Sequence, residues 1–172
     1  MLITEININF KAGNGGDGKV SFCKGKKGPD GGNGGKGGNI YITATSNIYA
    51  LNNLSKATKI EAENGQFGML NKKSGKAGQD LEVKLPIGTI ITDQDSQEIF
   101  EITSKNERFL LCKGGWGGKG NWEYRSGTNI TPLYAQKGFK GQQRRLYINL
   151  KLIADYGLIG FPNAGKSSLL KE

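Results

Sequence analysis

Short segments in which apolar and polar residues alternate recur along the chain. The first covers residues 2–10. One face would consist of Leu2, Thr4, Ile6, Ile8 and Phe10, and the other of Glu5, Asn7 and Asn9. This period of two is typical of a strand that is buried on one side only. Six later segments follow the same pattern: 39–45, 80–85, 88–93, 98–103, 108–113 and 144–153. Polar turn residues within 92–100 predict a β-hairpin there.

No convincing helical repeat occurs before residue 160, so the sequence predicts an all-β body, most simply a sandwich or a barrel. Glycine-rich runs separate the strands and cover residues 13–38, 65–78, 114–120 and 138–141. Glycine accounts for 28 of the 172 residues. Within the runs it recurs every third position, as at Gly25, Gly28, Gly31, Gly34 and Gly37.

A spacing of three matches the three residues per turn of polyproline II, so each run has a face without side chains along which another segment can pack. A flexible linker needs no such period. Collagen needs an unbroken repeat rich in proline, whereas this chain holds 4 prolines. We therefore predict polyproline II segments packed side by side and projecting from the β-body. Disordered glycine-rich loops are the alternative.

Lysine and arginine total 24 against 15 acidic residues, which gives a net charge of +9. This excess favours a polyanionic partner such as nucleic acid; scattered lysines on a soluble basic domain are the alternative. The absence of histidine excludes imidazole catalysis and histidine-containing zinc sites. Cys23 and Cys112 match no metal-ligand spacing and indicate a reducing compartment, with at most one incidental bridge.

The amino-terminal residues show no signal-peptide pattern, and no apolar stretch approaches the roughly 20 residues of a membrane span. We therefore expect neither secretion nor membrane insertion. The expected location is the cytoplasm, or an organellar matrix if a transit peptide has been removed.

Residues 160–167, GFPNAGKS, fit the phosphate-binding loop G-x-x-x-x-G-K-[ST]. An apolar segment before it is suited to a buried strand, and residues after it begin a helix. In this motif backbone amides surround a phosphate, Lys166 pairs with phosphate oxygens and Ser167 ligates Mg²⁺. The expected nucleotide site comprises Gly160, Phe161, Pro162, Asn163, Ala164, Gly165, Lys166, Ser167 and Ser168.

The chain ends at Glu172, before the second Mg²⁺-associated aspartate and the base-reading segment of a nucleotide hydrolase. We therefore expect two regions, a glycine-rich domain over 1–156 and the truncated start of an α/β nucleotide-binding domain over 157–172. No catalytic residue is expected within this chain, which should be inactive by itself while its longer parent hydrolyses nucleotide.

With these features in this order, the chain resembles the Obg family of ribosome-associated GTPases. The resemblance covers essentially the whole chain, and the matching stretches are GNGGDGKVSF (13–22), GPDGGNGGKGGNIYI (28–42), PIGTIITD (86–93), KGGWGGKGN (113–121) and LKLIADYGLIGFPNAGKSSLL (150–170). It implies the Obg fold, a mainly β domain in which an eight-stranded barrel bears a projection of six left-handed type II helices. A Ras-like G domain follows in that family.

The resemblance also implies a function. Obg-like proteins act in late assembly of the large ribosomal subunit, with the glycine-rich domain reaching toward the peptidyl-transferase region of the rRNA. The implied ligands are GTP or GDP with Mg²⁺, and ppGpp in some members. Asn163 matches the asparagine of potassium-dependent relatives and so implies a K⁺ site. We expect a monomer that is not bound to a membrane.

Lysines interleave the glycine runs, where they are suited to neutralise phosphates at the end of a projection. The candidates for rRNA binding are Lys24, Lys26, Lys27, Lys36, Lys72, Lys73, Lys76, Lys113, Lys119, Lys137 and Lys140, with Arg144 and Arg145 nearby. The aromatic residues among them either stack on unpaired bases or cap the glycine bundle; they are Trp116, Trp122, Tyr124 and Phe139. A protein-docking or regulatory module is the alternative function.

Overall fold

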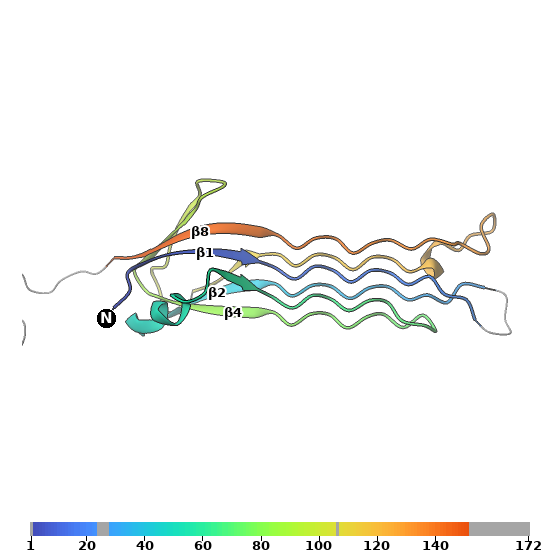
Figure 1. Ribbon diagram of the computed structural model, residues 1–172, viewed down its shortest axis with the longest axis horizontal. Coiled ribbons are helices and arrows are strands. Elements are labelled where there is room, and N and C mark those ends of the chain that lie inside the picture. The colour runs from blue at the N-terminus through green and yellow to red at the C-terminus, as the bar shows by residue number, and fades with distance from the viewer. Residues whose placement is uncertain (1, 24–27, 106, 152–172) are drawn as a thin grey trace, which may run out of the picture.

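The computed structural model describes residues 2–23, 28–105 and 107–151. Eight strands gather at one end of the molecule, and extended segments project from them in one direction (Figure 1). The elements in chain order are β1 (Glu5–Lys11), β2 (Ile40–Thr45), η1 (Ile48–Leu54), β3 (Lys59–Glu61), β4 (Leu81–Pro86), β5 (Thr89–Asp93), β6 (Ile99–Glu101), β7 (Arg108–Cys112), η2 (Asn121–Tyr124) and β8 (Gln143–Leu150).

The predicted mainly β fold is confirmed. The strands form a five-stranded sheet in the order β3-β1-β8-β5-β6 and a three-stranded sheet in the order β4-β2-β7. Both sheets are mixed, because β1 pairs with β3 and β2 with β4 in parallel. The eight-stranded barrel that the resemblance implied is not found: among the described residues no ladder joins the two sheets into a closed barrel, and the body is two sheets around a shared core.

The alternating patterns explain that core. Ile8 and Phe10 of β1 are buried, as are Leu146 and Ile148 of β8, while the intervening residues point outward. The predicted hairpin within 92–100 is confirmed by antiparallel pairing of β5 with β6. The sequence analysis missed β3, which has three residues, and two short 3₁₀ helices, η1 and η2, since helices of seven and four residues are too short to show a helical repeat.

Six extended segments form the projection, and we define them as 12–20, 30–39, 62–69, 73–80, 113–120 and 135–142. Their backbone hydrogen bonds repeat every three residues. From segment 12–20, the N–H groups of Gly13, Gly16 and Lys19 donate to the carbonyls of Gly38, Gly35 and Gly32 at 2.8–3.0 Å. This repeat supports the predicted polyproline II packing and argues against disordered loops.

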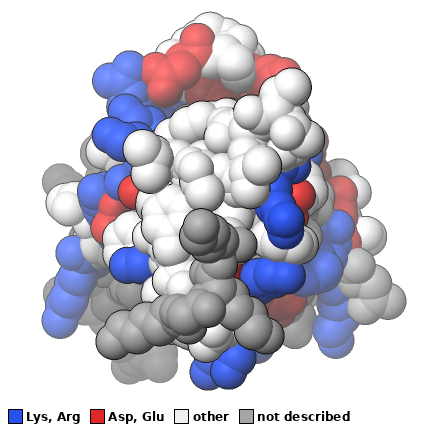
Figure 2. All heavy atoms as spheres, turned by 90° about the vertical axis from the view of Figure 1, so that its right-hand side faces the viewer, with Lys and Arg blue, Asp and Glu red and all other residues white. Residues whose placement is uncertain are grey.

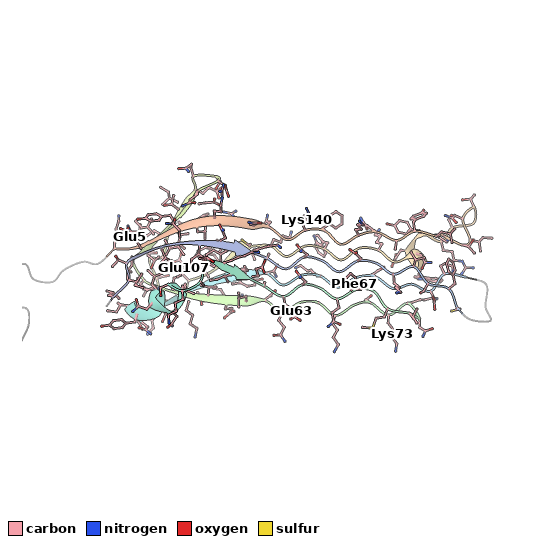
Figure 3. All side chains as sticks on the ribbon, in the orientation of Figure 1. Glu5, Glu63, Phe67, Lys73, Glu107 and Lys140 are labelled. Carbon is pink, nitrogen blue, oxygen red and sulfur yellow. The ribbon has the colours of Figure 1, made fainter. Side chains whose placement is uncertain are left out.

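Segments 12–20 and 30–39 lie at the centre of the projection. Segment 12–20 is bonded to four others, namely 30–39, 62–69, 113–120 and 135–142, and segment 30–39 is bonded to 12–20, 62–69, 73–80 and 113–120. The spacing leaves no room for inward side chains: a Cβ built on Gly34 would overlap the carbonyl oxygen of Gly16. Side chains therefore stand on the outside, among them Phe67, Lys73 and Lys140 (Figure 3).

Candidate nucleic-acid interface

The tip of the projection consists of residues 20–23, 28–30, 69–73 and 121–134, on three connections between segments. The connection at 69–73 is a tight turn in which Lys73 N–H donates to the Leu70 carbonyl at 3.3 Å. Its two central residues, Asn71 and Lys72, have φ of 56° and 59°. Positive φ at both positions is the geometry of a type I′ turn. A lysine there is strained by about 1 kcal/mol or more, so surrounding contacts must hold it.

Asp30 supplies these contacts from a neighbouring segment. Its backbone carbonyl accepts from Lys72 N–H at 2.6 Å, and its carboxylate accepts from Asn71 N–H at 3.2 Å. The side chain is buried and also accepts from Ser21 Oγ and Cys23 Sγ. The hydrogen bond from Ser21, opposed by burial, lowers the carboxyl pKa below its ordinary value of 3.8. One carboxylate thus joins two connections of the tip.

Asn121 performs the same task for the third connection. Its buried side chain accepts from Gly31 N–H at 2.9 Å and donates to the carbonyls of Ser21 and Pro132, each at 3.1 Å. Nearby, the rings of Tyr124 and Tyr134 lie 4.9 Å apart. The long loop after residue 121 is therefore tied to the first glycine run.

The aromatic candidates divide into two kinds. Trp122 is half-buried, with Lys72 Nζ 3.3 Å and the Arg125 guanidinium 5.8 Å from its ring centroid, so it packs within the tip. Trp116 and Phe139 are 60% and 52% exposed on the flank of the projection. Both remain accessible for stacking, and neither is buried in the manner of a capping residue.

The end face of the projection combines uncharged and cationic groups. Seen end-on, residues without charge, drawn white, occupy much of the middle; Lys and Arg side chains lie around them, and Asp and Glu side chains are visible at the top and beside some of the cations (Figure 2). Exposed apolar residues of the tip include Leu70, Ile130 and Leu133, with Leu133 79% exposed. Cations near exposed apolar side chains suit a polyanion whose bases are unpaired.

The predicted lysines that the structure describes lie either at the tip or along the outside of the projection. Lys72 and Lys73 lie at the tip, and Lys36 and Lys113 lie beside Trp116 on the flank. Exposed positions along the outside of the segments account for four more: Lys76, Lys119, Lys137 and Lys140. Lys24, Lys26 and Lys27 fall outside the described residues, so their role stays a prediction.

Arg144 and Arg145 do not belong with these lysines. Both lie in β8 of the body. Arg144 pairs with Asp93 at 3.2 Å and with Glu98 at 3.0 Å. Arg145 pairs with Asp95, and its hydrogen bond lowers the pKa of that carboxyl. Their nearness in sequence to the fourth glycine run was misleading, because the chain enters a strand at Gln143.

The predicted phosphate loop, Gly160 to Ser168, lies outside the described residues. Within the ranges that the structure describes, no group of three or more acidic or cysteine residues is placed to hold a metal ion. Those ranges also hold no helix long and apolar enough to cross a bilayer. Cys23 and Cys112 are thiols and do not form the incidental bridge.

Comparison with known proteins decides the family. The model of the GTP1/OBG family matches residues 3–152. The chain belongs to the GTP1/OBG family. It is 42% identical to a GTPase Obg of Acidithiobacillus ferrooxidans, 44% to one of Sulfurihydrogenibium and 42% to one of Aquifex aeolicus, over 99% of its own length. These matches cover 47%, 51% and 51% of the relatives, so the chain spans about half the length of the curated relatives it matches.

For this GTP1/OBG chain, the sequence analysis missed Asp30 and Asn121, which hold the tip together. Their signal is weak: each is a single polar residue beside a glycine, as many are in these runs. Short polar side chains next to glycine are typical of turns, and that property marks where a segment reverses. It does not reveal which distant amides the side chain will bond.

Proposed function

We propose that the protein is a GTP-hydrolysing factor in assembly of the large ribosomal subunit, and that its glycine-rich projection docks on rRNA near the peptidyl-transferase region. The observation that carries the docking is the tip, where Lys72 and Lys73 lie next to exposed apolar side chains such as Leu70 at the end of the projection. The net charge of +9 supports it, because counterion release from phosphates favours basic partners.

Nucleotide binding rests on the motif at 160–168. In this proposal the amides of the loop and Lys166 hold the β- and γ-phosphates, and Ser167 ligates Mg²⁺; Asn163 is the candidate for a K⁺ site. GTP or GDP is the expected nucleotide, since the relatives are named GTPase Obg. Regulation by ppGpp, a monomeric state and a cytoplasmic location complete the proposal.

A full-length protein carrying Lys166→Ala tests the nucleotide part. Removing the ammonium from the phosphates should reduce GTP hydrolysis at least tenfold, because lost charge stabilisation in such loops costs about 2 kcal/mol or more. Lys171→Ala, which lies beyond the motif, is the matched control and should retain activity. Equal turnover by both variants would remove Lys166 from the site.

Docking is tested by cosedimentation of the protein with separated large and small ribosomal subunits at low and moderate salt. We expect binding to the large subunit that weakens as salt rises, because displaced counterions make phosphate-driven affinity salt-dependent. Lys72 and Lys73 at the tip supply the variants: reversing both to glutamate should weaken the association, whereas reversing Lys56 and Lys59 of the body should not.

The alternative function is docking on a protein, with nucleotide state as the regulator. The exposed apolar side chains of the tip favour it, because a surface of this kind also suits a protein interface. Association that persists at high salt and shows no preference between subunits would support this alternative over rRNA.

A further inference from the structure

Side-chain amides of segment 30–39 bond to the backbone of segment 113–120 at a regular spacing. Asn39 Oδ1 accepts from Gly114 N–H at 2.9 Å, and Asn33 Oδ1 accepts from Gly120 N–H at 2.8 Å. The three-residue repeat sets Lys36 opposite Gly117, midway between them. Lysine carries no acceptor, and Gly117 N–H has no hydrogen bond to any residue that the structure describes.

The other neighbour of segment 113–120 repeats this arrangement. Gln142 Oε1 accepts from Lys113 N–H at 2.9 Å, and Gln136 Oε1 accepts from Lys119 N–H at 3.3 Å. Between these two glutamines lies Phe139, opposite Trp116. Phenylalanine has no acceptor either, and within the described ranges Trp116 N–H also makes no hydrogen bond. Capping by side chains is thus interrupted on both sides at the same level of the projection.

Two cations and an exposed ring occupy this level. Trp116 is 60% exposed, and Lys36 Nζ and Lys113 Nζ lie 5.3 Å and 5.8 Å from its ring centroid. Neither ammonium forms an ion pair with a carboxylate in the part of the chain that the structure describes. No carboxylate of the described residues therefore neutralises this positive charge.

We propose that Lys36, Lys113, Trp116 and Gly117, which we call the flank site, bind one unpaired nucleotide of single-stranded RNA. The two ammonium groups that lie over the indole of Trp116 move aside to donate hydrogen bonds to the phosphate, together with Gly117 N–H, and the base stacks on the indole in their place. Stacking on an aromatic side chain with cations on the backbone is the general chemistry of single-strand recognition. The inference rests on the proposed function and extends RNA contact from the tip to the side of the projection.

Trp116 can report directly on its own site. The protein has 2 tryptophans, so Trp122→Phe leaves Trp116 as the single fluorophore. Titration with a short single-stranded oligouridylate should quench its emission, because stacking places the base against the indole. Polyglutamate at equal charge is the control polyanion and should not quench.

The interrupted ladder offers a variant that removes the site without weakening the fold. Lys36→Asn continues the series of Asn33 and Asn39 and supplies the missing acceptor for Gly117 N–H. It should fold normally and bind oligouridylate several-fold more weakly, with a salt dependence reduced by about one counterion. Lys56→Asn, at an exposed position of the body and outside the candidate lysines, is the matched control and should bind as the parent does.

Substitution of the ring separates stacking from charge. Binding of a fluorescein-labelled oligouridylate, followed by anisotropy, should weaken about tenfold in Trp116→Leu, because a stacked base is worth roughly 1–3 kcal/mol. Trp116→Phe keeps an aromatic face and should recover most of that loss. Equal affinity of Trp116→Leu and the parent protein would overturn stacking.

Two other results would overturn the flank site as a whole: quenching by polyglutamate equal to that by oligouridylate, or unchanged binding in Lys36→Asn. The proposed function fails separately. If the flank variants bind oligouridylate as the parent does while the protein still cosediments with large subunits, only the flank site is refuted; loss of cosedimentation by the parent itself refutes the proposed function.

Discussion

Adding one methyl group at Gly34 tests whether the projection depends on contact between glycine faces. An ideal Cβ on Gly34 would overlap the carbonyl oxygen of Gly16, far inside the 3.0 Å that real Cβ atoms keep. The obstacle is backbone, which cannot rotate away as a side chain can. In Gly34→Ala the central segments 12–20 and 30–39 must therefore separate by more than an ångström.

Hydrogen bonds set the size of the effect. The separation would stretch Gly16 N–H to Gly35 O and disturb Gly34 N–H to Gly118 O, both now 2.8 Å. A buried backbone group that loses its partner costs about 1–3 kcal/mol, so two such bonds predict about 2–6 kcal/mol of lost stability. With a urea m-value of about 2 kcal/mol/M, the unfolding midpoint should fall by about 1–3 M.

Urea unfolding followed by tryptophan fluorescence measures this loss, because both tryptophans lie on the projection. Far-UV circular dichroism follows the β-body in the same samples. Gly127→Ala is the matched control, since a Cβ there meets nothing within 4 Å. Its free energy of unfolding should change by no more than about 0.5 kcal/mol. Equal midpoints for the two variants would refute tight glycine packing.

Three further predictions concern single groups. Asn121→Ala should cost about 2–4 kcal/mol in urea unfolding, because its side chain makes three hydrogen bonds of 2.9–3.1 Å; Asn129→Ala, whose side chain makes none among the described residues, should stay within about 0.5 kcal/mol. The pKa of Asp30 is lowered, so its stabilisation of the tip is complete above pH 3.8 and should be lost only on further acidification. The amide resonance of Asn71, whose N–H donates to this carboxylate, should shift below that pH and not above it. Burial raises the pKa of the Cys112 thiol from 9.0 to about 11. The stability that the neutral buried thiol contributes is therefore present below pH 9 and should fall as the pH rises toward 11. In thermal unfolding, the melting temperature of Cys112→Ala should fall less with rising pH than that of the parent protein.

The repeat of three was sufficient to predict a packed projection, because only a glycine face permits such close approach. It was not sufficient to predict which segments are neighbours. Gly13, Gly16 and Lys19 bond to 30–39, while Gly15 and Gly18 bond to 135–142. Every glycine presents the same backbone, so the choice depends on where the body releases and receives each segment.

The candidate interface was predictable in composition and not in arrangement. Lysines among glycines indicated a basic projection, and Lys72 and Lys73 do lie at its tip. Trp116 and Trp122 look alike in sequence, each near basic residues, yet one is exposed on the flank and the other packs beneath Lys72 at 3.3 Å. That difference arises from a turn held by Asp30, about 40 residues earlier in the chain than the turn itself.

A bundle packed through its glycine backbone leaves many of its side chains on the outside, where they can serve other purposes. Along segment 30–39, Asn33 and Asn39 use their outward positions to cap amides of segment 113–120, whereas Lys36 at the same phase does not. Exchange of one residue in such a series changes the local chemistry from structural to ligand-binding and leaves the glycine contacts untouched. Because both neighbours interrupt their caps beside Trp116, the projection can carry a recognition site on its flank without any change in its core.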